Sequence, residues 1–176
     1  GGRFNPDEAV NRAEFLKMLV LAADLDTNSA SDSLFSDVSS SDWYEPYVMA
    51  AYDAGIVSGY GDGYFHPENY ITRLEALKMI MQVSDIPVGD YDSSIYSDVT
   101  GWGVPYVESH RVLNINIMRP YGDIFQPDVY LTRAESVKSI FRGVLSLDSY
   151  WNDDYNDYEG EEGEYRFMKI ESGNYI

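Results

Sequence analysis

Residues 65–75 read FHPENYITRLE, and the same pattern occurs twice more, as FNPDEAVNRAE at residues 4–14 and FQPDVYLTRAE at residues 125–135. The leading phenylalanines of successive copies lie 61 and then 60 residues apart. A steady period of this length indicates a repeat array, in which each unit buries its apolar face against its neighbours. The fold therefore follows from the repeated unit, and any surface feature of that unit is presented several times.

Each copy ends in a predicted helix start. Asn11, Thr72 and Thr132 are followed three residues later by a glutamate, the arrangement in which the cap oxygen and the glutamate bond to each other's backbone amides. This capping explains Glu14, Glu75 and Glu135 without a catalytic role. Apolar residues then recur at helical spacing. We expect them to face the core on three helices: Phe15, Leu16, Leu19 and Val20; Leu74, Leu77, Ile80 and Met81; Val137, Ile140, Phe141 and Val144.

The other half of the unit occurs twice, as FSDVSSSDWYEPY at residues 35–47 and YSDVTGWGVPY at residues 96–106. It predicts a second helix that Asp42 caps, and a similar one near Gly101, both packed outside the core helices. Gly55 and Asn114 are suited to the left-handed conformation that ends such helices. The expected organisation is an all-α array of helix–loop–helix units, with the first opening in mid-repeat: unit one at 1–30, unit two at 31–90, unit three at 91–147 and a tail at 148–176.

The composition excludes several functions. Thirty acidic residues against twelve basic ones give a formal charge of −18, which would repel a phosphate backbone, so we expect no nucleic-acid partner. The absence of cysteine excludes disulfides and thiolate metal sites. No apolar run approaches the roughly 20 residues that cross a membrane, and no signal peptide or cofactor fingerprint is visible. Neutral glycans, cations and basic surfaces remain as partners.

The predicted tail, residues 148–176, is acidic and rich in aromatic residues. Acidic runs are usually solvated, while the aromatic side chains favour docking, so order and disorder are weighted evenly. Residues 152–157 read NDDYND, which resembles part of a calcium loop but lacks its glycine and its final glutamate. We predict no specific metal site and no cofactor.

The ordered motifs F-S-D-V, W-x-x-x-Y, G-I-V-S-G-Y-G-D-G, F-x-P and I-T-R-x-E resemble the bacterial S-layer homology (SLH) domain, over residues 4 to about 146. The resemblance implies three units packed as a pseudo-threefold spindle around a central helical bundle. It also implies an extracellular protein of the bacterial surface, held non-covalently on a secondary cell-wall polysaccharide. In that family a pyruvylated N-acetylmannosamine lies in grooves between the prongs, against the arginine of the T-R-A-E motif.

The three arginines of the motif are the leading candidate ligand-binding residues. Arg12, Arg73 and Arg133 occupy the first helical position, where the helix dipole disfavours a cation by roughly 0.3–1 kcal/mol. Either pairing with a neighbouring acid or binding of a ligand carboxylate would explain them. The resemblance favours the ligand. Unit two is the most intact, so we expect Arg73 to belong to the site if only one operates.

The remaining candidates have structural alternatives of similar weight. Asp37 and Asp98 are either caps or turn formers, or they bond sugar hydroxyls. We expect Trp43 and Trp102 to be core residues or groove walls more than platforms for sugar stacking. Gly59 supplies turn freedom in the loop, and Asp62 either lines the groove or forms the turn. His66 and His110 share no repeat position and receive no role.

Two non-enzymatic functions compete. The first is anchoring through an acidic wall polysaccharide. The second is self-assembly into a surface layer or filament, with the incomplete first repeat completed by a neighbouring chain. Other copies of the chain or a parent surface protein are the expected protein partners. Glycan cleavage by paired carboxylates has little support, because each repeated acid already has a structural explanation. We therefore expect a binding module and no enzyme.

Overall fold

The computed structural model describes residues 3–28 and 34–145, so the predicted acidic tail and its candidate cation loop lie outside the described residues. The described chain forms five α-helices and no named strand: α1 (Arg12–Ala22), α2 (Glu45–Asp53), α3 (Arg73–Val83), α4 (Val104–Val112) and α5 (Arg133–Ile140). A 3₁₀ turn, η1 (Gly101–Gly103), precedes α4, and a π turn, η2 (Phe141–Leu145), follows α5. The all-α prediction is confirmed.

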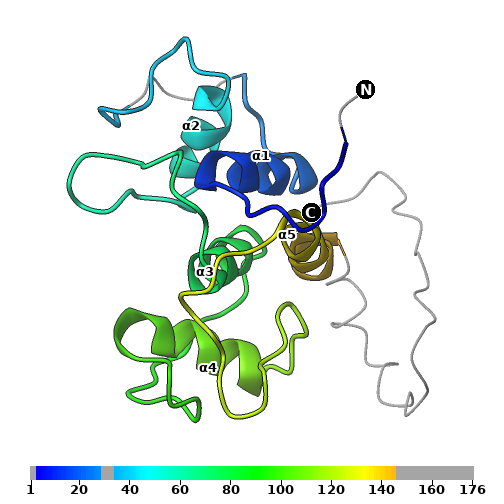
Figure 1. The fold of residues 1–176 in the computed structure, drawn as a ribbon. Coiled ribbons are helices and arrows are strands. Elements are labelled where there is room, and N and C mark those ends of the chain that lie inside the picture. Colours follow the sequence, from blue (N-terminus) through cyan, green and yellow to red (C-terminus); the bar gives the residue numbers. More distant parts are fainter. Residues whose placement is uncertain (1–2, 29–33, 146–176) are drawn as a thin grey trace, which may run out of the picture.

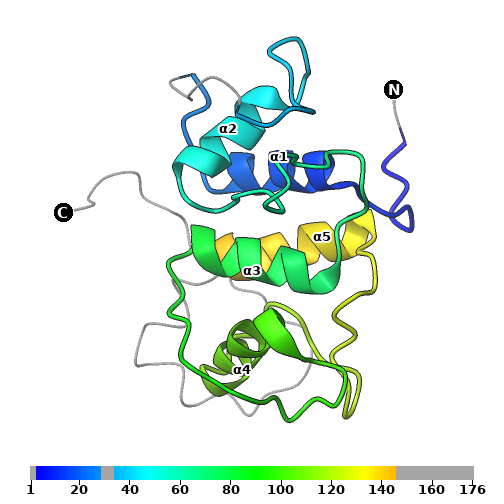
Figure 2. The ribbon, with the colours of Figure 1, turned by 90° about the vertical axis from the view of Figure 1, so that its left-hand side faces the viewer.

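The helices form an inner group with outer helices on either side. α1, α3 and α5 lie together, α2 packs on α1, and α4 packs on α3 at the opposite end of the molecule (Figures 1 and 2). This agrees with the predicted placement of the two aromatic-bearing helices outside the core helices. The spindle shape implied by the resemblance stays a prediction.

The core helices begin where the sequence predicts. The side chains of Asn11, Thr72 and Thr132 each accept a hydrogen bond from the backbone amide three residues on, and the glutamate there accepts one from the cap residue's own amide. Such a cap contributes about 1 kcal/mol to a helix. Three equivalent capping boxes therefore fix the start of α1, α3 and α5.

The outer helices match their predicted starts differently: the 3₁₀ turn that leads into α4 begins at Gly101, as predicted, whereas α2 begins later than predicted. α2 starts at Glu45, after Tyr44, which makes no side-chain cap. The Asp42 carboxylate accepts from the Ser39 amide instead, so it stabilises the preceding turn and the predicted cap is wrong. Their ends are as predicted, because Gly55 (φ 72°) and Asn114 (φ 53°) both adopt the left-handed conformation.

The turns that precede the core helices are joined in a closed cycle. The Val10 amide donates to the Leu131 carbonyl at 3.0 Å, Leu131 to Ile71 at 3.1 Å, and Ile71 back to Val10 at 3.0 Å. These residues occupy the same position in the three copies, and all three are fully buried. The cycle gives this end of the helical group an approximate threefold relation between units.

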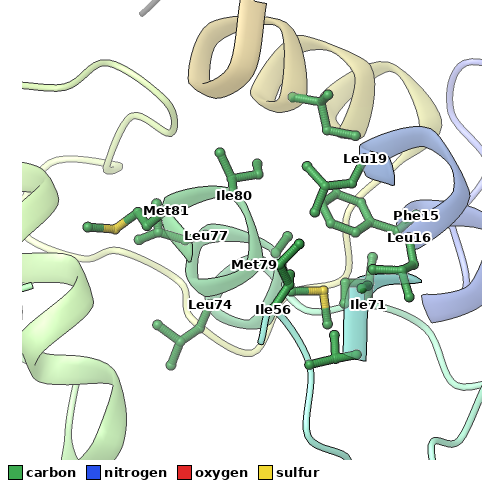
Figure 3. Packing of buried hydrophobic residues seen from close by; sticks show 14 of the residues in the cluster. Phe15, Leu16, Leu19, Ile56, Ile71, Leu74, Leu77, Met79, Ile80 and Met81 are labelled. Carbon is green, nitrogen blue, oxygen red and sulfur yellow. The ribbon is translucent and has the colours of Figure 1, made fainter. Parts of the chain in front are cut away.

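The core lies between α1 and α3 and continues under α5. Phe15, Leu16 and Leu19 of α1 and Leu77 and Ile80 of α3 belong to one cluster of buried side chains (Figure 3). Each of these side chains is fully buried, as the helical spacing predicts.

The predicted face of α5 is wrong at one position. Val137 is 44% exposed, whereas Ser136 and Ser139 are buried. α2 packs on α1 and α4 packs on α3, but in the part of the chain that the structure describes no outer helix packs on α5 to a similar extent. Its outward face therefore remains open, and small serine side chains face the neighbouring helices.

Candidate site at the junction of three repeats

A pocket of about 190 Å³ opens where parts of three repeats meet. Its walls come from the start of α1, the loop that follows α2, one face of α3 and the 3₁₀ turn before α4. Three of the predicted site residues meet here: Arg12, Gly59 and Trp102. The lining consists of Arg12, Ile56, Val57, Ser58, Gly59, Tyr60, Glu75, Lys78, Met79 and Trp102.

Arg12 is bound by the protein on several sides. Its Nε donates to the Phe65 carbonyl at 3.1 Å, and its Nη1 donates to Glu75 Oε1 at 3.1 Å. The guanidinium carbon lies 4.6 Å from the centre of the Tyr60 ring, and the side chain is almost completely buried. Pairing with a neighbouring acid, one of the two explanations offered for this arginine, is thus present.

Tyr60 closes the pocket over this ion pair. Its hydroxyl donates to Glu75 Oε1, the same oxygen that Arg12 contacts. Burial, followed by this hydrogen bond, raises the pKa of Tyr60. Glu75 also caps α3 through its other oxygen, so a single carboxylate joins the helix start, the arginine and the loop.

Lys78 is the cation that the sequence interpretation missed. It lines the pocket with its ammonium 5.9 Å from the centre of the Trp102 ring, and no ion pair is recorded for it among residues 3–28 and 34–145. A signal was available in the sequence, because a lysine lies five residues after the arginine in every copy: Lys17, Lys78 and Lys138.

The arginine and the loop of one site come from different units. The amide of Arg12 donates to the Asn69 carbonyl, that of Arg73 to Val129, and that of Arg133 to Glu8. Each arginine therefore reaches into the loop of another unit. The sequence interpretation combined Arg73 with the intact loop of its own unit, whereas the pocket combines that loop with Arg12.

Arg73 has a different environment. Its Nε donates to the Phe125 carbonyl at 3.1 Å and its Nη2 to the Arg119 carbonyl at 3.0 Å. The guanidinium lies 5.2 Å from the Tyr121 ring centre. Burial lowers the pKa of Arg73, and the described residues give it no ion pair. It does not line the pocket, and its predicted role in ligand binding stays a prediction.

Arg133 resembles Arg12 but is more exposed. Its Nε donates to the Phe4 carbonyl at 2.9 Å, and its Nη1 lies 3.6 Å from Glu14 Oε1. The side chain keeps 29% of its surface in solvent. A surface ion pair at this distance contributes ~1 kcal/mol at most.

Asp37 and Asp98 fasten the loops that receive the arginines. The two oxygens of Asp37 accept from the amides of Phe65 and His66 at 2.8 and 2.7 Å. Asp98 does the same for Phe125 and Gln126 at 2.9 and 2.7 Å. These contacts join residues almost thirty positions apart and were not among the roles weighed from the sequence. A contact of Asp37 or Asp98 with sugar hydroxyls stays a prediction.

The two tryptophans lie at the surface. Trp43 is 51% exposed and Trp102 is 55% exposed, so neither is a core residue. Trp102 forms a wall of the pocket. Trp43 faces Lys17, whose ammonium is 5.2 Å from its ring centre, at the equivalent place between α1 and α2.

Gly59 and Asp62 shape the loop of the pocket. Gly59 has φ 71°, and a Cβ there would lie 2.8 Å from both the Phe35 ring and the Tyr64 carbonyl, so only glycine fits. Asp62 accepts from the Tyr64 amide at 3.0 Å and pairs with His66 Nε2 at 2.8 Å. The hydrogen bond from His66 lowers the pKa of Asp62. Turn formation thus accounts for Asp62, which does not line the pocket.

Comparison with known proteins identifies the repeat. The family model of the S-layer homology domain matches residues 34–77, so the chain carries this domain, and the copies on either side repeat its motifs. The chain is 30% identical over 159 residues to the cellulosome-anchoring protein of Acetivibrio thermocellus, covering 83% of this chain and 35% of that protein.

Two proteins of Bacillus anthracis are also similar. An uncharacterized cell wall amidase is 28% identical over 143 residues, and the S-layer protein sap is 26% identical over 143 residues. Each match covers 79% of this chain but only 26% and 17% of those proteins. The chain thus spans about a third or less of these three relatives. The domain and the relatives together indicate a location at the cell surface. Within the described residues, no helix is long and apolar enough to cross a membrane.

Proposed function

We propose that this chain anchors the protein that carries it to the cell surface, by binding an acidic, pyruvylated cell-wall polysaccharide in the pocket between Arg12 and Trp102. The domain and its relatives support the anchoring role. One observation supports an anionic ligand: Lys78 lines the pocket beside the exposed ring of Trp102, and it forms no ion pair within residues 3–28 and 34–145. An anionic sugar matches both features.

Lys78 and Arg12 have separate parts in this proposal. Glu75 already neutralises Arg12, and Tyr60 covers it, so Arg12 fixes the loop and positions the carboxylate of Glu75. Lys78 meets the ligand carboxylate, because its ammonium borders the pocket and carries no recorded ion pair. Trp102 offers an apolar wall for the sugar ring. No catalytic step is proposed.

The test is calorimetry with purified pyruvylated wall polysaccharide. Lys78→Gln should weaken binding roughly tenfold to hundredfold, as expected for loss of a contact worth ~1.5–3 kcal/mol. Lys17→Gln is the matched control, since Lys17 faces Trp43 in the same way but lies outside the pocket. Removal of the pyruvyl group should make the wild type and Lys78→Gln bind alike. Equal binding of both proteins to the pyruvylated glycan would refute the assignment of Lys78.

Self-assembly is a second candidate, favoured by one observation. Lys17 faces Trp43 as Lys78 faces Trp102, Arg133 pairs with Glu14 as Arg12 pairs with Glu75, and Trp43 is half exposed. In this second proposal, a neighbouring copy of the chain packs on this face. An apparent molar mass from light scattering that rises with protein concentration, and that stays at the monomer value in Trp43→Ala, would support assembly. A constant monomer mass would exclude it.

A further inference from the structure

A strip of three aromatic rings borders the pocket on the loop between α2 and α3, which extends away from the core helices (Figure 1). The rings of Tyr60 and His66 meet edge to face, with centres 5.2 Å apart. Those of His66 and Tyr64 are stacked at 22° with centres 5.7 Å apart. Both tyrosines keep over two-fifths of their surface in solvent. We call Tyr60, His66 and Tyr64 the aromatic strip.

The aromatic strip is held in place by several bonds. Asp62 accepts from the Tyr64 amide and pairs with the His66 ring, and Asp37 accepts from the His66 amide at 2.7 Å. His66 itself has φ 57°, in the left-handed region that few residues other than glycine adopt. These contacts keep the three rings together on the surface of a loop. A rigid aromatic surface of this kind binds a ligand with little loss of side-chain freedom.

The aromatic strip is continuous with the pocket. Tyr60 belongs to both, because it lines the pocket and contacts His66. A polysaccharide that places one sugar in the pocket must continue past its rim. At the Tyr60 side of the rim, the next surface it meets is the aromatic strip.

The two surfaces differ in charge. In the pocket Glu75 is paired with Arg12, so that Lys78 remains as the cation, whereas outside the pocket Asp62 borders the aromatic strip with its side chain about half exposed. Sugar hydroxyls can donate to the remaining lone pairs of this carboxylate, while the apolar face of a pyranose packs on the rings. A second carboxylate at this place would be repelled.

We propose that the aromatic strip is a second sugar subsite, which binds an uncharged pyranose adjoining the acidic sugar in the pocket. The proposal rests on the proposed function of the pocket. It assigns Tyr64, His66 and Asp62 to recognition of glycan length and charge, beyond the single sugar that the pocket accommodates.

Calorimetry with two probes tests it: pyruvylated N-acetylmannosamine alone, and a disaccharide that adds one uncharged N-acetylhexosamine. We expect the wild type to bind the disaccharide roughly threefold to tenfold more tightly, the range that one aromatic contact gives. Tyr64→Ala should lose this gain and keep the affinity for the monosaccharide. Tyr70→Ala is the control, because Tyr70 is as exposed but lies away from the pocket, beside Tyr130.

The outcomes separate the two proposals. Binding of the monosaccharide without a gain for the disaccharide refutes the subsite and leaves the function of the pocket intact. A gain that survives in Tyr64→Ala, or a loss of affinity for both probes in that variant, also refutes it. If neither probe binds, the proposed function fails and the subsite with it. A disaccharide whose second sugar carries a carboxylate should show no gain.

Discussion

Arg12 and Arg73 begin equivalent helices in the same motif, yet their surroundings differ. Both are buried and both donate through Nε to the carbonyl of a phenylalanine in another unit. Arg12 also pairs with Glu75, under the ring and hydroxyl of Tyr60. Arg73 instead uses the Arg119 carbonyl, and no ion pair to Glu135, the counterpart of Glu75, is recorded in the described chain. The two arginines therefore share a sequence motif, but only Arg12 lines the pocket.

The loops explain the difference. The loop facing Arg12 reads SGYGDG at residues 58–63, whereas the one facing Arg73 reads MRPYGD at residues 118–123. Arg73 donates to the Arg119 carbonyl of the second loop, whereas Arg12 donates to the Glu75 carboxylate of α3, which Tyr60 of the first loop also contacts. A repeat motif therefore determines how a helix starts, while the loop of another unit determines what the arginine can do.

The largest effect should come from α3, which serves both arginines: it begins with Arg73 and supplies Glu75 and Lys78 to the pocket. Leu77→Ala should cost ~2–5 kcal/mol in the free energy of unfolding, because a fully buried leucine leaves a cavity. Val137→Ala, at the same repeat position but exposed, should change it by only about 0.5 kcal/mol or less. Urea unfolding of both variants measures this. Similar losses would show that α5 is buried after all.

The second effect is a pH dependence of stability that arises at His110, near Arg73. His110 is buried, and burial, followed by the charge of Arg73, lowers its pKa to about 4. The unfolded chain, with a histidine pKa of about 6.5, therefore takes up a proton before the folded one does. The contribution of His110 to the free energy of unfolding should be fully present above pH 6.5 and should fall by about 3 kcal/mol as the pH drops to 4.

His110→Gln removes this titration while retaining an acceptor for the Met118 amide, which bonds to His110 Nε2 at 3.3 Å. The difference between wild type and variant should therefore change with pH between 6.5 and 4, when unfolding is followed at several pH values. A constant difference would show that His110 titrates normally in the folded protein.

The third effect separates the two arginine sites by binding. Arg73→Met should leave the affinity for pyruvylated polysaccharide within about threefold, while Lys78→Gln loses roughly tenfold or more. The reason is that Arg73 does not line the pocket. Parallel calorimetry decides between them. If Arg73→Met loses as much affinity as Lys78→Gln, Arg73 also takes part in ligand binding, as the resemblance implies.

The smallest effect compares two tyrosines. Tyr60→Phe removes the hydroxyl that donates to Glu75 and should cost about 0.5–1.5 kcal/mol of stability. Tyr121→Phe, at the equivalent place over Arg73, removes a hydroxyl with no carboxylate partner recorded in the described chain, and should be nearly neutral. Thermal unfolding of the two variants provides the comparison. Equal losses would mean that the two arginine environments are alike.

The sequence predicted the features that are local. A capping box joins residues three apart, so Asn11, Thr72 and Thr132 could be identified as helix starts from spacing alone. The same holds for the left-handed ends at Gly55 and Asn114.

The candidate site could be predicted only in part. The sequence predicts Arg12, Gly59 and Trp102 as site residues, and all three line the pocket. Their grouping was not foreseen, because Arg12 bonds to a carbonyl 53 residues away, in another unit. Asp37 contacts a loop 28 residues on, and the sequence contains no sign of that distance. Lys78 was missed because a lysine on a helix is ordinarily a solvated residue.

The closed cycle of hydrogen bonds through Val10, Ile71 and Leu131 makes folding of this array a collective event. In an open solenoid each repeat contacts only its neighbours, and the ends can fray one unit at a time. Here the first and last copies pair directly, across more than a hundred residues of chain. Closing that loop has an entropic cost that is recovered only when all three turns are present. Loss of any one copy therefore removes two of the three hydrogen bonds at once, and the pocket, which combines residues of all three copies, forms only when the whole ring does.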